Sequence, residues 1–189
     1  MMDDYISLSA LNDFIFCPYS IYLHNVYMES DKDIFQAVPQ TTGKIAHRTI
    51  DLQTAKGGKF DLAGISVQSE ELKIRGKIDL YRFNKKLLVE RKYQLKQIFR
   101  GQLYQLWGEY FCMVEMEYEV MHIAFYEIST NKMYMQNLPS ERDKAELIRF
   151  IDSFRAYDLS YPIKINRNKC MHCIYCNLCD KTDVINVYT

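Results

Sequence analysis

Two carboxylates and a lysine stand in the segment Leu72–Lys92 (LKIRGKIDLYRFNKKLLVERK) at a spacing that could bind a cation. Apolar and polar residues alternate in two runs on either side of positions 84–85, a pattern that predicts a β-hairpin. With 84–85 as the turn, Asp79 lies opposite Glu90. Lys92 then shares a strand face with Glu90, because side chains alternate between the two faces of a strand. The hairpin is therefore expected to gather two acids and a lysine.

Facing carboxylates of this kind suit a divalent metal ion. Like charges directly opposite each other on paired strands are destabilising, so a cation between Asp79 and Glu90 would explain the pair. Mg²⁺ and Mn²⁺ prefer carboxylate oxygens. The spacing D-x10-E-x-K also suits metal-assisted phosphodiester hydrolysis, in which the metal activates a water and Lys92 neutralises developing charge. An ordinary hairpin with a charged, solvated face is the alternative.

A second metal signal lies near the C-terminal end, where four cysteines occur in ten residues. They have the spacing C-x2-C-x2-C-x2-C and are Cys170, Cys173, Cys176 and Cys179. Zinc ribbons usually separate two C-x2-C pairs by a dozen or more residues, whereas iron–sulfur sites combine closely spaced cysteines with a distant one. Cys17 is the natural distant ligand and would join the two ends of the chain. A four-thiol site without Cys17, or a zinc site that uses His172, is the alternative.

Length and composition favour one sizeable domain. The chain has 189 residues, 48% of them hydrophobic, which is ample for a packed core. The net charge is zero, so binding to nucleic acid would need local basic patches. The residues that could form such a patch near the hairpin are Lys73, Arg75, Lys77 and Arg100. No apolar run reaches the roughly 18 residues of a membrane span, and the acidic N-terminus does not resemble a signal peptide, so a cytoplasmic location is expected.

Helix and strand patterns alternate along the chain. Helices are expected over 7–27 with a break at Pro18, over 42–54, over 95–117 and over 139–157. Strands are expected over 65–69, in the hairpin, and over 120–128 and 133–138. The helix over 95–117 leaves directly from the hairpin, so its early polar residues could face the same site. Helices that flank a run of strands predict an α/β layered domain.

Taken together, these features resemble the CRISPR-associated RecB-like nuclease family (the Cas-four family) of the PD-(D/E)XK superfamily. The segments ISLSALNDFIFCP, GKIAH, GKIDL, LVERK, the glutamine-bearing helix and KCMHCIYCNLC occur in the family's order over nearly the whole chain. The start and the tail look most like the compact members found beside type V CRISPR effectors. The resemblance implies a nuclease core with a mixed central sheet flanked by helices. It also implies one domain over 1–189, with a helical region at 1–40, the core at 41–160 and the cysteine tail at 161–189.

The resemblance implies a role for individual residues. His47, Asp79 and Glu90 match the ligands of the Mg²⁺ or Mn²⁺ ion, and Lys92 matches the catalytic lysine. Gln105 matches the glutamine of the last RecB motif and would also belong to the catalytic group.

The glutamine motif is where the chain departs from the family. Gln102 is the rival to Gln105 as the motif glutamine. The family usually has a tyrosine four residues after the glutamine, whereas this chain has Glu109 there and Tyr110 one position later. The role of that tyrosine is therefore in doubt here.

The cysteines also match the family's pattern, with one departure. The resemblance implies that a structural [4Fe-4S] cluster is bound by Cys17, Cys170, Cys173 and Cys179. Cys176 falls in a gap of that pattern and is either a bystander or an alternative ligand.

The activity that the resemblance implies is cleavage of single-stranded DNA. Such enzymes process the ends of new spacers and help to select them during CRISPR adaptation, together with the integrase made of the Cas-one and Cas-two proteins. Two other functions stay open at this point. The chain could serve chiefly to recognise a DNA motif for the integrase, or it could be a zinc-binding regulatory module.

Overall fold

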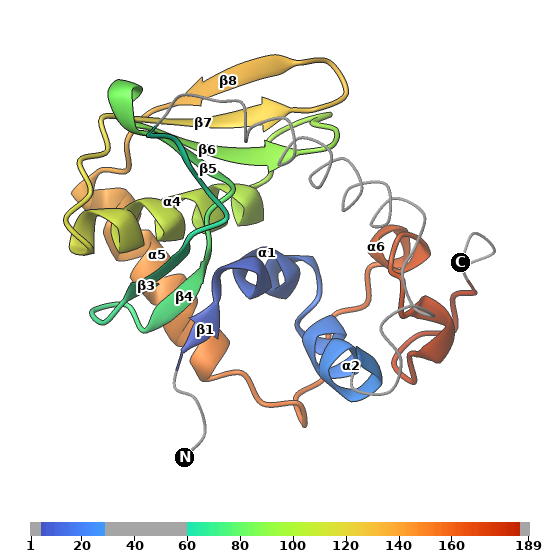
Figure 1. Ribbon diagram of the computed structural model, residues 1–189. Helices are drawn as coiled ribbons and strands as arrows, with labels where there is room; N and C mark the ends of the chain where they lie inside the picture. Colours follow the sequence, from blue (N-terminus) through green and yellow to red (C-terminus); the bar gives the residue numbers. More distant parts are fainter. Residues whose placement is uncertain (1–4, 29–59, 186–189) are drawn as a thin grey trace.

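The computed structural model describes residues 5–28 and 60–185 and has a mixed α/β architecture with two β-sheets (Figure 1). The larger sheet has the order β2-β5-β6-β7-β8 and consists of β2 (Leu62–Ala63), β5 (Leu80–Arg82), β6 (Leu87–Lys92), β7 (His122–Glu127) and β8 (Lys132–Gln136). In it β6 and β7 run parallel, and the other neighbours run antiparallel. The smaller sheet has the order β1-β4-β3 and consists of β1 (Ile6–Ser7), β4 (Ile74–Lys77) and β3 (Ser66–Ser69).

The helices and the two 3-10 turns complete the described fold. They are α1 (Leu8–Phe16), α2 (Pro18–Met28), η1 (Phe83–Lys85), α4 (Arg100–Glu115), α5 (Glu141–Arg155), α6 (Arg167–Met171) and η2 (Cys176–Leu178). Among the described residues, no helix is both long enough and apolar enough to cross a membrane. The helix expected over 42–54, which contains His47, lies outside the described residues.

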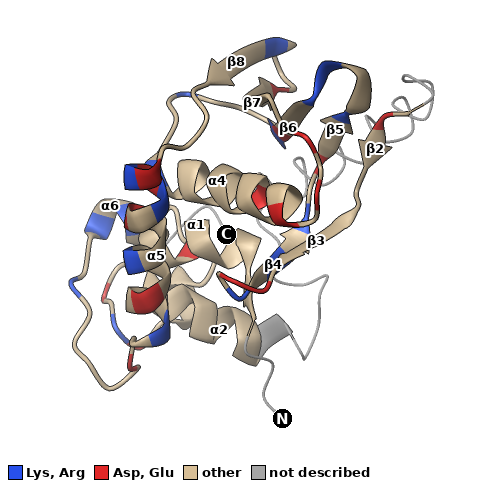
Figure 2. Ribbon diagram, turned by 90° about the vertical axis from the view of Figure 1, so that its left-hand side faces the viewer, with Lys and Arg blue, Asp and Glu red and all other residues tan. Residues whose placement is uncertain are grey.

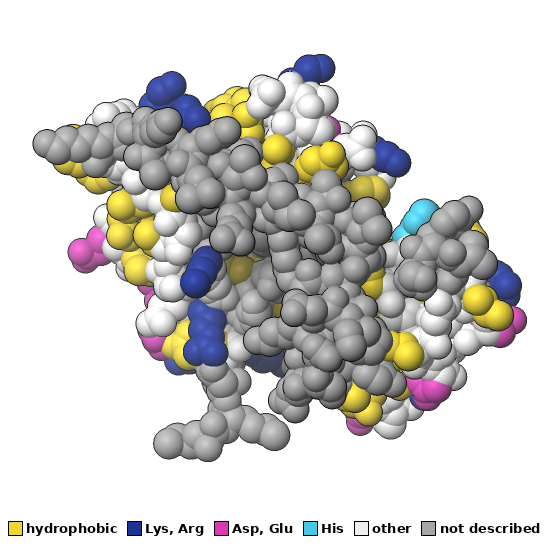
Figure 3. Space-filling view, turned by 45° about the vertical axis from the view of Figure 1, so that its right-hand side comes forward, with side chains coloured by type: hydrophobic (Ala, Val, Ile, Leu, Met, Phe, Trp, Pro, Cys, Tyr) yellow, Lys and Arg dark blue, Asp and Glu magenta, His cyan; other side chains and the backbone are white. Residues whose placement is uncertain are grey.

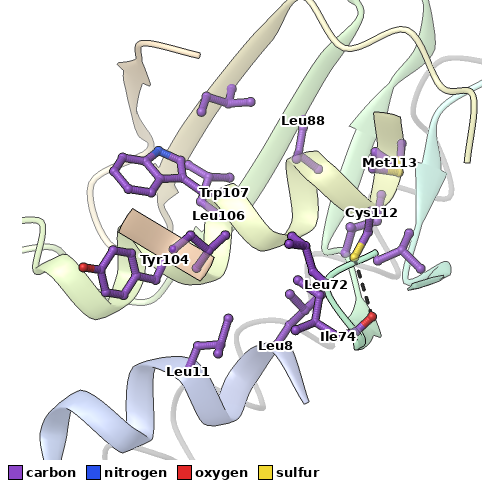
Figure 4. Packing of buried hydrophobic residues seen from close by; sticks show 14 of the residues in the cluster. Leu8, Leu11, Leu72, Ile74, Leu88, Tyr104, Leu106, Trp107, Cys112 and Met113 are labelled. Atoms are coloured by element: carbon purple, nitrogen blue, oxygen red, sulfur yellow. Dashed lines mark hydrogen bonds between the residues drawn. The ribbon is translucent and has the colours of Figure 1, made fainter. Parts of the chain in front are cut away.

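The main core lies between one face of the larger sheet and α4, with α1 on the other side of that helix (Figures 1 and 4). Leu88 of β6, Leu106 of α4 and Leu11 of α1 are each completely buried there. Burying one such side chain contributes roughly 1.5–3 kcal/mol. Because Leu88 faces α4, the period of two along β6 also directs Glu90 and Lys92 toward that helix.

A glycine allows α1 and α4 to approach closely. A Cβ atom at Gly108 would lie 2.6 Å from Cδ2 of Leu8 and 3.2 Å from Cδ1 of Ile74. Both neighbours are buried leucine or isoleucine side chains of the same core. The absence of a side chain at this position therefore lets α1 pack against the helix that faces the hairpin.

The expected break in the first helix is confirmed. The first helix ends at Phe16, Cys17 is extended, and α2 starts at Pro18. Proline suits the first position of a helix because its missing N–H would have no partner in the helix there. The backbone N–H of Cys17 donates to the carbonyl of Asp13, which ties the cysteine to the end of α1.

The expected hairpin is partly correct. The pairs Leu80–Val89 and Tyr81–Leu88 set the register of β5 and β6, and the same register places Asp79 opposite Glu90, as predicted. The two-residue turn is wrong, because the 3-10 turn η1 joins the strands and is followed by Lys86 in the left-handed region (φ 48°).

The first strand of the expected hairpin is also two strands. Residues 74–77 form β4 of the smaller sheet, and the chain joins the larger sheet only at Leu80. Ile78 consequently packs in the main core, whereas Leu80 packs in a separate cluster with Val89. In the single alternating strand that the sequence predicts here, Ile78 and Leu80 would share one face, and that expectation is wrong.

The long helix is shorter than expected. It begins at Arg100 and ends at Glu115, so the segment 95–99 is a connection rather than a first turn. The backbone N–H of Leu95 donates to Glu127 at the end of β7, which fixes this connection against the sheet (2.9 Å). β3, β7 and α5 lie within their expected ranges, and β8 begins one residue before its range, at Lys132. The short strands β1 and β2 were not expected.

Candidate active site

The predicted acids and lysine meet where the larger sheet faces α4. Asp79 lies just before β5, and its Oδ2 accepts a hydrogen bond from the backbone N–H of Arg91 (2.7 Å). Glu90 is buried, with 4% of its surface exposed, and its Oε1 accepts from Nζ of Lys92 (2.8 Å). The hairpin register and the strand period thus bring Asp79, Glu90 and Lys92 to one place.

Gln105 of α4 connects this group to the helix. Its Nε2 donates to Oε1 of Glu90 (2.7 Å), and its Oε1 accepts from Nζ of Lys92 (3.1 Å). The amide therefore holds the acid and the lysine at once. Gln102, the rival in the sequence, instead accepts from the backbone N–H of Phe99 and caps the start of α4 (2.9 Å). Gln105 is the glutamine that reaches the group.

Burial and charge strongly perturb the ionisable groups here. Burial raises the pKa of Glu90 to about 7; the nearby Lys92 opposes this rise, and Asp79 adds to it. Burial acts to lower the pKa of Lys92, but the carboxylates of Glu90, Glu109 and Asp79 together outweigh it, and the net shift is upward. A lysine that stays charged beside a buried carboxylate is what an electrostatic role in catalysis requires.

Sequence reasoning missed a third acid, Glu109. It lies one helical turn after Gln105 on α4, is completely buried, and accepts from Nε2 of Gln105 (3.1 Å). Burial, and then the charges of Glu90 and Asp79, raise its pKa well above the usual value. The signal in the sequence was the i, i+4 spacing from Gln105, which puts both residues on one helix face.

The basic residues considered as phosphate contacts lie elsewhere. Lys73 forms an ion pair with Glu70 (2.9 Å) and lies over the ring of Tyr5, as does Arg75. Arg100 pairs with Glu146 of α5. Figure 2 shows that α5 carries charges of both signs along its length, whereas α4 is mostly uncharged.

Lysine and arginine side chains also reach the surface at several separate places in Figure 3, between hydrophobic ones. For Lys73, Arg75 and Arg100, these contacts agree with the interpretation of a charged, solvated face.

The cysteines form a second centre, around a cavity of about 780 Å³ at the junction of the two chain ends. Five cysteines line it, and they are Cys17, Cys170, Cys173, Cys176 and Cys179. In Figure 1 the C-terminal segment with α6 returns to lie beside α2. Tyr19 donates to Asp180 (2.6 Å), and His24 is hydrogen-bonded to Tyr175 (2.6 Å), so side chains of α2 hold the tail in place.

Cys17 belongs with the tail cysteines. Burial raises the pKa of Cys173 to about 11, and the thiols of Cys17, Cys176 and Cys179 add to the rise. The pKa of Cys179 is raised by burial and also by Cys17 and Cys170. Cys17 is therefore close enough to the tail to act on the thiols of Cys173 and Cys179, and it lines the same cavity. His172 is exposed and does not line the cavity.

Cys176 differs from the other four. It is buried, and its Sγ donates to the backbone carbonyl of Val184 (3.1 Å). The thiols of Cys17, Cys170, Cys173 and Cys179 are half-buried. These contacts favour Cys176 as the spare cysteine.

The described side chains do not present a ready-made site for a single ion. Among residues 5–28 and 60–185, no group of three or more His, Cys, Asp or Glu side chains has the geometry to hold a metal ion. His47, the remaining ligand that the sequence suggested, lies outside the described residues.

Comparison with known proteins supports the fold. The fold is that of a known crystal structure, "Crystal structure of SSO0001". The TM-score is 0.66 at 18% sequence identity, and the alignment covers 96% of this chain and 88% of that chain. No protein-family model and no curated protein sequence matches the chain. At this identity the likeness establishes a shared α/β fold and nothing about activity.

Proposed function

We propose that the chain is a metal-dependent nuclease with a PD-(D/E)XK core, acting on single-stranded DNA ends. The observation that carries the proposal is the group formed by Asp79, Glu90, Lys92 and Gln105. The hydrogen bonds of Gln105 to both Glu90 and Lys92 hold an acid and a base together in a buried position. Buried charges that a fold retains in this way are typical of catalytic sites.

The donor atoms of Asp79 and Glu90 are of the kind that a hard divalent cation takes, although the described residues alone do not complete a metal-binding group. Asp79 and Glu90 would hold a Mg²⁺ or Mn²⁺ ion together with His47, because oxygen and imidazole donors suit these ions. The bound ion would supply an activated water and charge stabilisation. Lys92 would lie against the charge that develops on the phosphate, and Gln105 would keep Lys92 and Glu90 in position.

We also propose a [4Fe-4S] cluster bound by Cys17, Cys170, Cys173 and Cys179. The fit rests on the cavity that these cysteines line and on their half-buried thiols. The cluster would be structural, since it would join the end of α1 to the C-terminal tail. Leu11 of α1 packs in the core under α4, so this joint would also support the helix that carries Gln105.

The biological role proposed here follows the sequence resemblance. Within the Cas-four family the chain would process and select prespacers during CRISPR spacer acquisition, with the Cas-one and Cas-two integrase as its partner and DNA overhangs as its substrate.

The activity is tested with end-labelled single-stranded and duplex DNA of one sequence. We expect Mn²⁺ or Mg²⁺ to support shortening of the single strand, with the duplex cut more slowly. Excess EDTA should stop the reaction, and added Mn²⁺ should restore it. Cleavage that persists in EDTA, or the lack of any cleavage with Mn²⁺ and Mg²⁺, would contradict the proposal.

Single serine substitutions are expected to separate the ligating cysteines from Cys176. Cys173→Ser should remove most of the absorbance near 400 nm and most of the bound iron, since a hydroxyl binds iron poorly in place of a thiolate. Cys176→Ser should retain both, because Sγ of Cys176 is hydrogen-bonded to Val184. The measurements are iron and zinc content and bleaching by dithionite. Equal iron loss in the two variants would count against Cys176 as the spare cysteine, and zinc without iron would replace the cluster by a zinc site.

A further inference from the structure

A buried carboxylate oxygen of Glu109 has no hydrogen-bond partner. Glu109 is completely buried in the middle of α4, and its Oε2 lies away from solvent without a donor among the residues that the structure describes. Buried polar atoms are nearly always paired, because an unpaired one loses its hydration and gains nothing in return. The oxygen therefore calls for a cationic or donor partner.

The other oxygen of Glu109 shows where that partner would lie. Nε2 of Gln105 donates both to Oε1 of Glu109 (3.1 Å) and to Oε1 of Glu90 (2.7 Å). Two carboxylates that share one donor nitrogen lie near each other, although in the metal-free geometry the described acids do not complete a metal-binding group. The charges of Glu90 and Asp79 both act on Glu109, which places all three acids within electrostatic reach of one another.

The local charge also favours a cation. Three acids gather here, and Lys92 contributes one positive charge, held against Glu90 (2.8 Å). A divalent ion would bind the carboxylate oxygens directly, in place of the protons that such crowded acids otherwise take up.

We propose that Glu109 is a third carboxylate ligand of the divalent-cation site of Asp79 and Glu90, an inference that rests on the proposed nuclease function. In this arrangement the side-chain amide of Gln105 positions two of the ligands, Glu90 and Glu109, through hydrogen bonds from Nε2. The alternative is a purely structural role, in which Glu109 accepts a hydrogen bond from Gln105 and so positions it. The two differ in what a neutral side chain of the same shape should do.

Glu109→Gln keeps an oxygen that can accept from Gln105 and removes the negative charge. We expect it to weaken Mn²⁺ binding by at least about tenfold, a loss in the range seen when groups around a metal are removed. Binding is followed by the electron paramagnetic resonance signal of free Mn²⁺ during titration of the full-length protein. The rise in melting temperature caused by Mn²⁺ should shrink in parallel.

Two further variants make the test decisive. Glu115→Gln, on the same helix but directed at the backbone N–H groups of Glu70 and Glu71, is the matched control and should bind Mn²⁺ as the wild type does. Glu109→Met fills a similar space without a charge. It replaces Glu109→Gln in the test if circular dichroism shows that Glu109→Gln does not fold. Wild-type affinity in a folded Glu109 variant would overturn the inference and leave the nuclease proposal intact. A wild-type protein that binds no Mn²⁺ and cuts no DNA would overturn both.

Discussion

Replacing Lys92 by alanine is expected to lower the rate of DNA cleavage about 10³-fold while Mn²⁺ binding persists. Nζ of Lys92 contacts Oε1 of Glu90 (2.8 Å) and Oε1 of Gln105 (3.1 Å), so the ammonium is held in one position. A fixed cation beside developing charge stabilises the transition state more than the ground state, and losing such a group typically costs 10²–10³ in rate. Removing a positive charge does not remove a ligand of the cation, so Mn²⁺ affinity should stay within about threefold.

Asp79→Ala is expected to differ from Lys92→Ala in its affinity for Mn²⁺. It should lose activity to a similar degree but should also lose Mn²⁺ affinity, because it removes a proposed ligand. Lys85→Ala, in the exposed turn of the same hairpin, is the control and should cleave at the wild-type rate. Rates come from single-turnover cleavage of labelled single-stranded DNA, and affinities from Mn²⁺ titration. Activity of Lys92→Ala within tenfold of the wild type would remove Lys92 from the catalytic group.

Lys92→Ala should also leave Glu90 buried without its cation. Truncating one member of a buried pair is destabilising by roughly 3–5 kcal/mol, because the other charge is left uncompensated. Glu90 can relieve this cost by binding a proton, so the variant should be more stable at pH 6 than at pH 8. The fold of Lys92→Ala should therefore be compared with that of the wild type by circular dichroism at pH 6.

The stability of the metal-free protein is expected to fall as the pH rises from 4.5 to 7. The pKa of Glu90 is about 7 in the folded protein, against an ordinary value of 4.5. Between these values the folded state holds a proton that the unfolded state has released, so each rise in pH favours unfolding. The loss amounts to about 3 kcal/mol over the window, at 1.36 kcal/mol for each pH unit of difference. Below pH 4.5 and above pH 7 the contribution of Glu90 is constant.

Glu90→Gln should reduce this slope, and Glu109, whose pKa is also raised, should contribute what remains. Urea unfolding at pH 5, 6, 7 and 8 in EDTA gives the free energy of unfolding of both proteins. The advantage of the wild type over Glu90→Gln should decline through that range. Glu127 and Glu146, whose pKa values are lowered to about 2 by their hydrogen bonds, change charge below this window and do not mask the effect. A difference between the two proteins that does not vary with pH would contradict the prediction.

Added Mn²⁺ should counteract the loss at high pH. A metal ion competes with protons for the same carboxylates, so it binds more tightly once Glu90 is ionised. The stabilisation by Mn²⁺ should therefore be larger at pH 8 than at pH 6, which is opposite to the trend of the metal-free protein.

Local patterns determined much of the site in advance. The spacing from Asp79 to Glu90 was sufficient for their register, because strand pairing across a short connection is set by counting residues. Pro18 ended one helix and began the next because proline lacks the N–H that a continuous helix needs. The tight spacing of the tail cysteines predicts a metal centre, and the structure brings these cysteines to one cavity.

Tertiary contacts decided what those patterns left open. The run from Leu72 to Arg82 reads as one strand, yet it divides between two sheets. Its first part, β4, pairs with β3, which directly precedes it, and with β1, which comes from the distant N-terminal end of the chain. Helical spacing put Glu109 on the face of Gln105, but only the packing of α4 against the sheet buried it beside Glu90. Each of these outcomes depends on long-range neighbours that a local pattern does not contain.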